Sequence, residues 1–560
     1  MTLAHALGRT LVHSGIRHGF GVVGSGNFHL ARAFADAGGT FTAARHEGGA
    51  ATMADAYART SGEVAMLSVH QGCGYTNAIT GIAEAAKSRT PMVVLAPAAT
   101  ALNSNFYINQ SAIASAIGAA ERTLTDPVSA VEDLARDGAA ERTLTDPVSA
   151  VEDLARAVDT ARRERQTVVV NLPVTLLAEP DPGHAPPAPT PAERPAPTGE
   201  DLRRFRDTLR ASRRPVFIAG RGGRDARGEL LDLAETAGAL LGTSAVATGL
   251  FSGEAWNLGI CGGFSSPVAA QLIAEADLLV GWGCALNMWT TRHGRLIGEG
   301  TQVVQVDDTP AALGAHRTID LGIHGDVALT AAMLRDLLER DGAQPSMGYR
   351  TRQVQQLLEG SSWPDQPFED SSEAARIDPR ILTMELDAML PQPRVVGIDS
   401  GNFMGYPAAY FHHVDERSLC FTQAFQSIGL GLATAIGAAI AEPQRLAIAA
   451  LGDGGAAMGL AELETISRLE LPMIVVVYND SAYSAEVHHF DGENHDQVRF
   501  PDVDFARVAT GLGFEALTVT APGDLAPVQE WLHRRDRPLL IDAKITSREP
   551  AWWLSEAFGH

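Results

Sequence analysis

Short, unbroken apolar runs recur along the chain between stretches with a helical pattern. Examples are "EVAMLSV" in the first third, "PVFIAG" near the middle and "PMIVVVYND" in the last third. A continuous apolar run of this length is typical of a strand buried on both faces, as in a parallel sheet. Strands that alternate with helices imply parallel sheets covered by helices on both faces. The sequence therefore predicts an α/β fold of doubly wound parallel sheets.

Two loop-like stretches divide the 560 residues into three α/β blocks. The first block spans residues 1–180, and a linker rich in Pro and Ala follows at 181–199. The second block spans 200–345, a polar connection covers 346–375, and the third block takes 376–560. We expect each block to be one domain with its own parallel sheet.

One sequence occurs twice inside the first block. "GAAERTLTDPVSAVEDLAR" stands at 118–136 and again at 138–156, a tandem 20-residue duplication within 118–157. Two copies are too few for a solenoid. We interpret the repeat as a recent duplication or as an error of sequence assembly. One copy is expected to fit the sheet, and residues 128–147 are expected to form a surface excursion.

Composition excludes several classes of function. The net charge of −23 provides no basic field for nucleic acid or for an anionic membrane. The four cysteines form no CxxC pair, which argues against a disulfide scaffold or a zinc site and suits the cytoplasm. The amino-terminal sequence lacks a signal-peptide pattern, and no apolar run reaches the roughly 18 residues of a membrane span. We expect a cytoplasmic protein.

A Gly-Asp-Gly turn follows the apolar run "RLAIAAL", and an Asn-Asp pair ends the next run, "PMIVVVY". If the two strands are neighbours, Asp453 and Asp480 converge at the carboxyl edge of one sheet. Gly452, Gly454 and Gly455 allow close backbone approach and leave amides for an anion. Two unrelated turns are the alternative reading of the same letters.

The segment between these turns, "MGLAELETISRLE", has the pattern of an amphipathic helix. Its amino-terminus would point at the same edge and favour a phosphate group. An acidic side chain, a second oxygen ligand and a backbone carbonyl form half of the octahedron that Mg²⁺ requires, and phosphate oxygens and water can complete it. The pattern therefore predicts a magnesium–phosphate site.

The flanking sequence "IGAAIAEPQRLAIAALGDGG" resembles the signature of the thiamine-diphosphate enzyme superfamily, and departs from it at Ala450, where a larger aliphatic residue is usual. The resemblance implies that Asp453, Asp480 and the backbone carbonyl of Ala482 bind Mg²⁺. Asp480 stands where the family has Asn, which adds a negative charge beside the diphosphate. The three blocks would be the pyrimidine-binding, central and diphosphate-binding domains.

A second motif lies in the first block. "RHEGGAATMADAYARTSG" resembles the pyrimidine-domain motif of the family and places Glu47 as the carboxylate that bonds to the aminopyrimidine ring. That bond promotes loss of the cofactor's C2 proton. We expect Glu47 in a tight, partly dry cleft at the start of an Ala-rich helix. The alternative is a helix-terminal glutamate stabilised by the helix dipole.

"LSVHQGCGYTNAITGIAEAAKSRTP" resembles the next strand and helix of the family. "TNAITGIAEA" is similar to acetolactate synthases and implies that Asn77 lies at the cofactor. His70 stands where benzoylformate decarboxylase has a histidine, which implies catalysis. "GFGVVGSGNF" resembles the first loop of both enzymes, and Ser25 matches the active-site serine of the decarboxylase. A turn serine and a structural strand-end histidine are the alternatives.

In the third block, "QAFQSIGLGLATAIG" resembles the segment under the thiazolium ring. Ile428 would be the bulky aliphatic residue that bends the cofactor, with Gln426 beside it. "DSGNF" follows a strand and is expected to contribute Ser400 and Asn402 to a diphosphate or substrate loop.

"YSAEVHHF" places Glu486 where pyruvate decarboxylases carry a proton-relay glutamate, and we expect His488 and His489 to be structural or rim residues. We expect Phe106 and Gln110 to line the substrate cavity. The paired tryptophans of "REPAWWLSEAFGH" either form a lid or simply pack.

The resemblance implies a reaction on a 2-oxo acid: decarboxylation, followed by carboligation as in acetolactate synthases. Release of an aldehyde, as in benzoylformate and pyruvate decarboxylases, and a pyruvate-oxidase-like flavoenzyme are the alternatives, as is a catalytically silent relative. The loop "GCALNMWTTRHG" departs from the flavin-contact loop, so FAD is doubtful, and Met288 stands near the position of a second decarboxylase histidine. The family also implies a homodimer or homotetramer with the cofactor between subunits.

Overall fold

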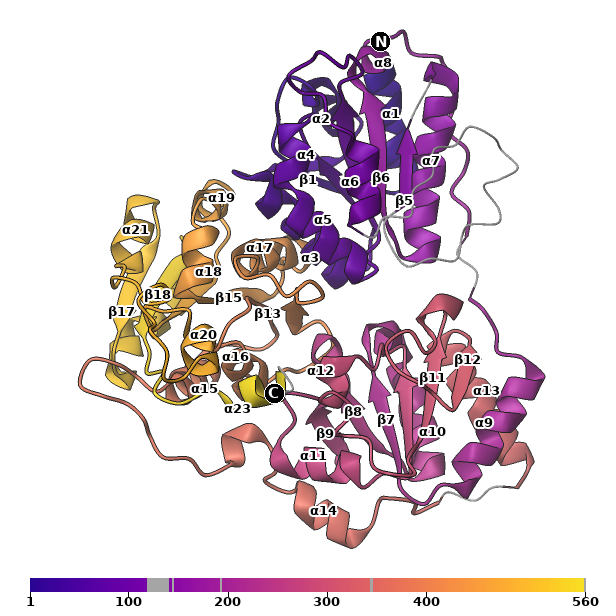
Figure 1. The fold of residues 1–560 in the computed structure, drawn as a ribbon, viewed down its shortest axis with the longest axis vertical. Helices are drawn as coiled ribbons and strands as arrows, with labels where there is room; N and C mark the ends of the chain where they lie inside the picture. Colours follow the sequence, from indigo (N-terminus) through magenta and orange to yellow (C-terminus); the bar gives the residue numbers. More distant parts are fainter. Residues whose placement is uncertain (118–139, 144–145, 192–193, 343–345, 558–560) are drawn as a thin grey trace.

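Each of the three blocks forms a six-stranded sheet, and every strand pair is parallel within the residues that the structure describes. The structure is a computed structural model that describes residues 1–117, 140–143, 146–191, 194–342 and 346–557. Helices cover both faces of the sheets (Figure 1). The predicted fold class, α/β with three doubly wound parallel sheets, is confirmed.

The first block contains the sheet that is uppermost in Figure 1. Its strands are β1 (His18–Gly21), β2 (Thr40–Ala43), β3 (Ala65–Ser68), β4 (Met92–Ala98), β5 (Ala140–Thr143) and β6 (Thr167–Pro173). Its helices are α1 (Leu3–His13), α2 (Phe28–Asp36), α3 (Glu47–Ser61), α4 (Cys73–Asn77), α5 (Ile79–Lys87), α6 (Gln110–Ala116), α7 (Pro147–Glu164) and α8 (Val174–Leu177).

The second block contains strands β7 (Pro215–Ala219), β8 (Leu240–Thr243), β9 (Asn257–Ile260), β10 (Leu278–Trp282), β11 (Gln302–Asp307) and β12 (Leu321–His324). Its helices are α9 (Gly199–Ala211), α10 (Arg227–Ala237), α11 (Pro267–Ala274), α12 (Met288–Thr291) and α13 (Val327–Arg340), with 3-10 turns at Arg221–Ala226, Ala245–Ala247 and Pro310–Ala312. α14 (Arg352–Leu358) and a 3-10 turn at Trp363–Asp365 follow in the connection to the third block.

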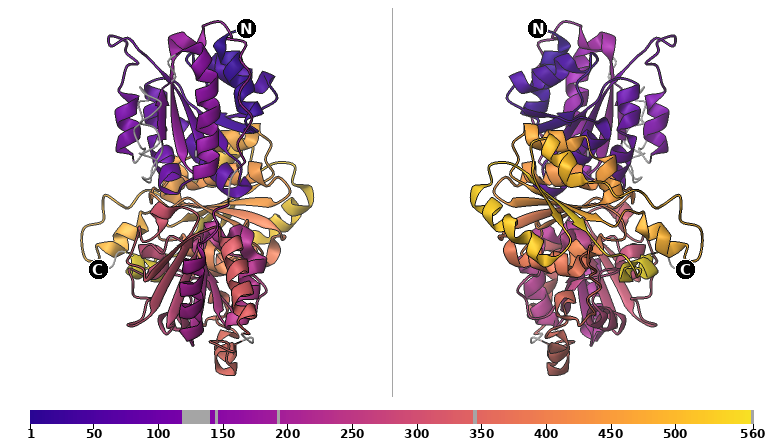
Figure 2. Two further views of the ribbon diagram at one scale, coloured as in Figure 1. Left: turned by 90° about the vertical axis from the view of Figure 1, so that its right-hand side faces the viewer. Right: turned by 90° about the vertical axis from the view of Figure 1, so that its left-hand side faces the viewer.

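The third block lies between the other two in both views of Figure 2. Its strands are β13 (Arg394–Ile398), β14 (Leu419–Phe421), β15 (Leu446–Gly452), β16 (Ile474–Asn479), β17 (Glu515–Val519) and β18 (Leu539–Lys544). Its helices are α15 (Pro379–Met389), α16 (Gly405–Tyr410), α17 (Gly431–Ala441), α18 (Asp453–Met458), α19 (Glu462–Arg468), α20 (Ser484–His489), α21 (Phe505–Gly511), α22 (Ala526–Arg534) and α23 (Trp552–Ala557), with a 3-10 turn at Pro522–Leu525.

The first and third sheets share one strand order. The orders are β2-β1-β3-β4-β6-β5 and β14-β13-β15-β16-β18-β17. In a doubly wound sheet, ligands bind at the carboxyl ends of the strands at the topological switch point, where the strand order reverses. That point lies between β1 and β3 in the first sheet and between β13 and β15 in the third. The loops after these four strands are therefore the positions in which to look for a binding site.

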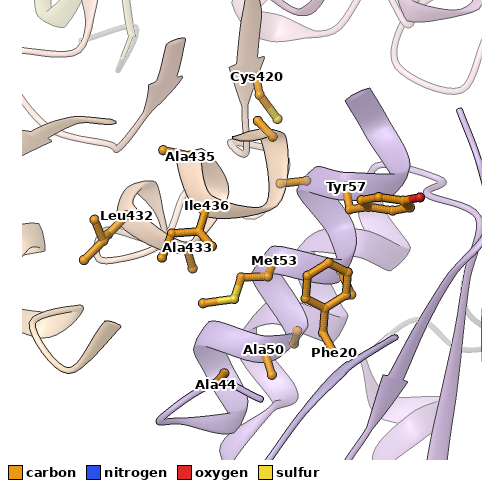
Figure 3. Packing of buried hydrophobic residues seen from close by; sticks show 14 of the residues in the cluster. Phe20, Ala44, Ala50, Met53, Tyr57, Cys420, Leu432, Ala433, Ala435 and Ile436 are labelled. Atoms are coloured by element: carbon orange, nitrogen blue, oxygen red, sulfur yellow. The ribbon is translucent and has the colours of Figure 1, made fainter. Parts of the chain in front are cut away.

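The first and third blocks meet through the packing of α3 on α17 (Figure 3). Met53 of α3 and Ile436 of α17 are fully buried in a single apolar cluster that includes residues of both blocks. Gly437 permits the close approach, because a Cβ there would lie 2.3 Å from the carbonyl oxygen of Met53. This contact fixes the start of α3 relative to the third sheet.

The carboxyl-terminal tryptophans pack into the body of the protein. Trp553 is fully buried, and its ring centroid lies 5.0 Å from that of Tyr406. A Cβ on Gly405 would lie 2.3 Å from the Trp553 ring, so glycine is required at that contact. Trp552 packs against Trp363 with ring centroids 4.1 Å apart. Of the two readings left open by the sequence, packing is the one that the structure supports.

The expected surface excursion at 128–147 is wrong for part of its length. Residues 140–143 form β5 and pair in parallel with β6, and α7 begins at Pro147. The second copy of the repeat runs directly into the rest of α7, which explains why this copy supplies the strand. The remaining residues of the expected excursion, 128–139 and 144–145, lie outside the described residues.

No helix in the described part of the chain is long and apolar enough to cross a membrane.

Deleting residues 118–137 removes one period of the repeat. Ile117, which precedes the first copy, then directly precedes the second copy, so the local sequence at the junction does not change. We expect the shortened protein to keep its circular dichroism spectrum and its thermal unfolding midpoint, because β5 and α7 come from the second copy. A lowered midpoint or a loss of folding would show that the first copy is needed.

Candidate functional site

Two carboxyl groups, of Asp453 and Asp480, meet at the carboxyl edge of the third sheet. Gly452 on β15 lies opposite Tyr478 on β16, so the residues that follow the two strands emerge side by side. Burial and then the charge of Asp480 raise the pKa of Asp453 to about 7. Burial also raises the pKa of Asp480. Two carboxylates that repel each other in a desolvated position favour a cation between them.

The neighbours of this pair are suited to holding a divalent cation. Among the described residues, no group of three or more His, Cys, Asp or Glu side chains could hold a metal ion. A cation at Asp453 and Asp480 therefore needs other oxygen ligands, and the backbone of the buried Ala482 lies two residues beyond Asp480. Hydroxyl and phosphate oxygens are further ligands of the kind that Mg²⁺ accepts. The residues present fit the metal that the sequence predicts.

Asn479, the first residue of the Asn-Asp pair, has a structural role. Its side-chain amide donates to Asp542 Oδ1 at 3.0 Å and to the carbonyl of Val503 at 3.2 Å. The backbone N–H of Ser481 donates to the Asn479 side-chain oxygen at 3.2 Å. These bonds hold the turn in which Ser481 has a left-handed φ of 62°. Asn479 thereby orients Asp480 toward Asp453.

The predicted glycines lie under tight contacts. A Cβ on Gly454 would lie 2.3 Å from the Tyr483 ring, and one on Gly455 would lie 2.0 Å from Asp399 Oδ2. At Gly452 the nearest atom would be on Phe403, at 3.1 Å. The three glycines thus let the start of α18 pack against neighbouring side chains.

Asp399 organises the loop that precedes α17. It is 1% exposed and accepts hydrogen bonds from the backbone N–H groups of Ser400 and Gly429, the latter at 3.0 and 3.1 Å. Burial raises the pKa of Asp399 to about 6. Gln426 has a left-handed φ of 61°, and Ile428 is half-buried next to Gly429. The structure therefore brings the predicted Ile428 segment to the edge that carries Asp453.

The predicted loop residues after β13 have different surroundings. Asn402 is buried; its amide nitrogen donates to the Ser547 hydroxyl at 3.1 Å, and its oxygen accepts the backbone N–H of Ala551 at 3.2 Å. Both ends of the Asn402 side chain thus anchor the carboxyl-terminal segment. Ser400 is half-buried and follows the switch-point strand β13 directly.

On the first sheet, Glu47 begins α3 beside two other predicted residues. The Asn77 amide donates to Glu47 Oε2 at 3.0 Å. A Cβ on Gly74 would lie 3.1 Å from Glu47 Oε1 and 2.9 Å from the His70 Cβ, so these side chains surround one glycine. The structure brings Glu47, Asn77 and His70 together at the carboxyl edge of the first sheet.

His70 follows β3 and faces the turn after β1. A Cβ on Gly24 would lie 2.8 Å from the His70 ring, and Ser25 is exposed in that turn. The Phe106 ring centroid lies 5.2 Å from that of His70. Phe106 is 41% exposed, and its place in a substrate cavity stays a prediction.

The expectation that Gln110 lines a cavity is wrong. Gln110 is 5% exposed, and its amide donates to Asn171 Oδ1 at 2.8 Å and to the carbonyl of Ala96. A buried polar side chain requires such partners. Gln110 therefore holds α6 against β4 and β6.

A cavity of about 490 Å³ opens next to Asp480 in the third block. One face of α20 and the turn after it line this cavity with Ser484, Val487, His488 and Asp491. Burial lowers the pKa of His488. These four residues follow the helical spacing of three and four, and Glu486 falls outside it, exposed to solvent.

His488 is therefore a candidate for proton transfer in this cavity, whereas the sequence led us to expect a rim or structural residue. Its Nε2 lies 3.3 Å from the Ser547 hydroxyl, which also accepts a hydrogen bond from Asn402. The helical spacing of Ser484 and His488 is the signal that could have found it. The proton-relay role of Glu486 stays a prediction.

Known protein families match the chain in three successive parts. Residues 1–116 match "Thiamine pyrophosphate enzyme, N-terminal TPP binding domain", residues 202–334 match the central domain, and residues 399–543 match the C-terminal TPP binding domain.

Among curated relatives, a sulfoacetaldehyde acetyltransferase of Rhodobacter capsulatus is 30% identical over 517 residues, covering 87% of this chain and 83% of the relative. A probable 2-ketoarginine decarboxylase of Pseudomonas aeruginosa is 29% identical, and the match covers 86% of this chain and 82% of the relative. Among solved structures, a thiamine diphosphate-dependent 4-hydroxybenzoylformate decarboxylase of Rhodococcus jostii RHA1 has a TM-score of 0.76, with 98% of this chain and 100% of that chain covered. At 18% identity, that similarity shows the fold.

The substitution Asp480→Asn tests the repulsion between the two carboxylates. Without divalent metal, we expect the variant to be more stable to denaturant than the parent by on the order of 1 kcal/mol, because Asp453 then faces no second buried charge. The exposed Asp536→Asn is the matched control and should leave the free energy of unfolding unchanged. Equal or lower stability of the Asp480 variant would contradict the assignment.

Proposed function

Because the chain belongs to the thiamine pyrophosphate enzyme family, we propose that it binds thiamine diphosphate with Mg²⁺, decarboxylates a 2-oxo acid and transfers the remaining fragment to a second carbonyl compound. The chain is an enzyme of the acetolactate synthase and decarboxylase type. The dependence on Mg²⁺, the 2-oxo acid as substrate and the carboligation step are the parts proposed.

The observation that carries the proposal is the pair of neighbouring carboxyl groups at the ends of β15 and β16. Asp453, Asp480 and the carbonyl of Ala482 would hold Mg²⁺, and the amides at Gly454 and Gly455 open α18 next to them. The positive charge of Mg²⁺ would offset the like charges of the two carboxylates, and diphosphate oxygens would be further ligands for the metal. Because Asp480 carries a charge that an asparagine would lack, a bound cation offsets more repulsion here than it would beside an asparagine.

When bound, thiamine diphosphate supplies a carbanion that adds to the keto carbon and an electron sink that allows carbon dioxide to leave. Glu47 would hold a proton at the aminopyrimidine ring. The hydrogen bond from Asn77 fixes which way the Glu47 carboxylate points. Ile428 would pack against the bound cofactor, with Gln426 in the same loop, next to the Gly429 that Asp399 anchors.

His70 is proposed to move protons to or from the substrate, with Ser25 as a substrate contact. Both lie at the switch point of the first sheet, and His70 and Glu47 flank the same glycine, Gly74. Ser400 is proposed to contact the diphosphate or the substrate from the switch point of the third sheet. Glu486 keeps its proposed relay role, and His488, which lines the cavity beside Asp480, is the competing candidate.

Carboligation is preferred to simple release of an aldehyde. A probable acetolactate synthase large subunit of Methanococcus aeolicus is among the relatives. The sulfoacetaldehyde acetyltransferase of Rhodobacter capsulatus, by its name, transfers an acetyl group to an acceptor, and it is 30% identical to this chain. The probable 2-ketoarginine decarboxylase supports the alternative, a lyase that protonates the fragment and releases it.

A site shared between two copies of the chain is part of the proposal. No residue of the first block lines the cavity beside Asp480, among the residues that the structure describes. Large apolar side chains are exposed around both halves of the site: Val23, Phe28, Phe106, Phe425, Met458 and Phe490. Such side chains mark surfaces that a partner covers. A homodimer or homotetramer in which Glu47 of one chain faces Asp453 of another would cover them.

FAD is not part of the proposed cofactor set. At the switch point of the second sheet, a Cβ on Gly220 would lie 2.3 Å from the carbonyl oxygen of Gly283, so the loops after β7 and β10 pack closely against each other there. Arg221, in the same loop, donates to the backbone carbonyl of Ser88 in the first block. A cytoplasmic location, which four cysteines without a disulfide support, completes the proposal.

Glu47→Gln tests the proton role. We expect the variant to bind thiamine diphosphate and Mg²⁺ with little change in affinity and to lose at least about 100-fold in kcat, because only the proton transfer is removed. Cofactor binding is measured by calorimetry and turnover by carbon dioxide release. An unchanged kcat would remove Glu47 from this role.

Product analysis with a panel of 2-oxo acids separates the candidate reactions. With a 2-oxo acid and an aldehyde or second 2-oxo acid as acceptor, we expect carbon dioxide and a hydroxyketone from a colourless protein. Aldehyde as the main product would favour the lyase. A yellow protein that consumes oxygen would favour a flavoenzyme, and no turnover of any 2-oxo acid despite bound cofactor would contradict the proposal.

A further inference from the structure

A buried glutamate of the third block, Glu462, holds the chain just before Glu47. Glu462 is 3% exposed, and its Oε1 accepts the backbone N–H of His46 at 3.0 Å and that of Arg45 at 3.2 Å. Its Oε2 accepts the Thr465 hydroxyl at 2.7 Å. Because His46 is the residue that caps α3, the carboxylate of Glu462 grips the entry to the helix on which Glu47 is the first residue.

The environment of Glu462 explains why a carboxylate is present there. A buried charge is costly unless it is well hydrogen-bonded. Here the backbone N–H groups of Arg45 and His46 satisfy the charge, and the amino-terminal end of α3 adds a favourable dipole. The fit is close, because a Cβ on Gly49 would lie 2.4 Å from Glu462 Oε1. Among the described residues, no other side chain of α19 accepts a hydrogen bond from a backbone N–H group of the first block.

We propose that Glu462 is a positioning residue for the reaction: its carboxylate fixes the backbone of residues 45 and 46 and thereby the place of the Glu47 side chain. This inference rests on the proposed role of Glu47. Glu462 itself is not proposed to touch the cofactor. It lies on α19, which follows the turn at Asp453, the proposed metal site, in the same chain. A residue of the third block thus positions the start of α3 in the first block of the same chain.

Glu464, two residues further along α19, provides a matched comparison. Its carboxylate pairs with the Arg45 side chain at 2.6 Å and with Arg468 at 3.2 Å, and the Arg45 side chain is 54% exposed. An exposed pair of this kind contributes little to stability. Glu464 thus contacts the same segment as Glu462, but through the Arg45 side chain and not through the backbone N–H groups of Arg45 and His46.

The test compares Glu462→Ala, Glu462→Gln and Glu464→Gln. In the protein without cofactor, hydrogen–deuterium exchange of the peptide spanning residues 43–50 should be faster in Glu462→Ala than in the parent. With saturating thiamine diphosphate and Mg²⁺, the same variant should lose about 10- to 100-fold in kcat with little change in KM, since a misplaced group slows chemistry without weakening binding. Glu462→Gln keeps an acceptor oxygen and should recover most of both properties, and Glu464→Gln should match the parent.

Unchanged exchange or unchanged kcat in Glu462→Ala would overturn the proposal. If Glu462→Ala does not fold, Gly49→Ala replaces it, because the added methyl displaces the carboxylate while keeping the charge. The exchange measurement does not depend on catalysis. Failure of the proposed function would therefore appear as an unaffected Glu47→Gln enzyme, whereas failure of this inference would appear as an unaffected peptide.

Discussion

The packing of α3 on α17 is the contact on which the rest of the candidate site depends. Met53 and Ile436 are buried in one apolar cluster that contains residues of both the first and the third block. Burial of apolar side chains has no direction of its own, so polar contacts must set the angle and register of the two blocks. Gly437 brings the helices together, and polar groups at their ends then decide where the site residues lie.

Two buried carboxylates, Glu462 and Glu84, perform that task, and a third, Asp399, makes the same kind of hydrogen bond within one block. Glu462 of the third block accepts the N–H groups of Arg45 and His46 in the first block. Glu84 of the first block accepts the N–H groups of Ala424 and Phe425 in the third block, at 2.9 and 2.6 Å. Asp399 accepts the N–H of Gly429 within the third block. Carboxylate hydrogen bonds of this kind are directional, so each of them places one loop of the site.

The sequence reveals the elements and the edge of the sheet better than it reveals individual side chains. Unbroken apolar runs identified the strands because buried parallel strands require them, and Asp453 and Asp480 could be placed on one edge because parallel strands end together. Strand order is absent from such a pattern, since any of the apolar runs can pair with any other. That the second copy of the repeat forms β5 could likewise be seen only from the structure.

Side-chain roles are hard to predict where a polar residue has two possible partners. The amide of Gln110, which was expected to line a cavity, binds Asn171 inside the protein. The amide of Asn402 donates to Ser547, and its expected contact with a ligand stays a prediction. The case of His488 differs, because its helical spacing from Ser484 could have placed it on the cavity. Glu462 gave no signal in the sequence, because the backbone N–H groups that it accepts from the first block lie more than four hundred residues away.

The proposed cofactor site is built from the first block of one chain and the third block of another. Mixing the two inactive variants Glu47→Gln and Asp453→Asn, after dissociation and reassembly, tests this directly. Random pairing makes half of the dimers mixed, and each mixed dimer has one intact site, so the account predicts recovery of about a quarter of the parent activity. No recovery, although mixed dimers are shown to form, would place both residues in the site of a single chain and contradict the account.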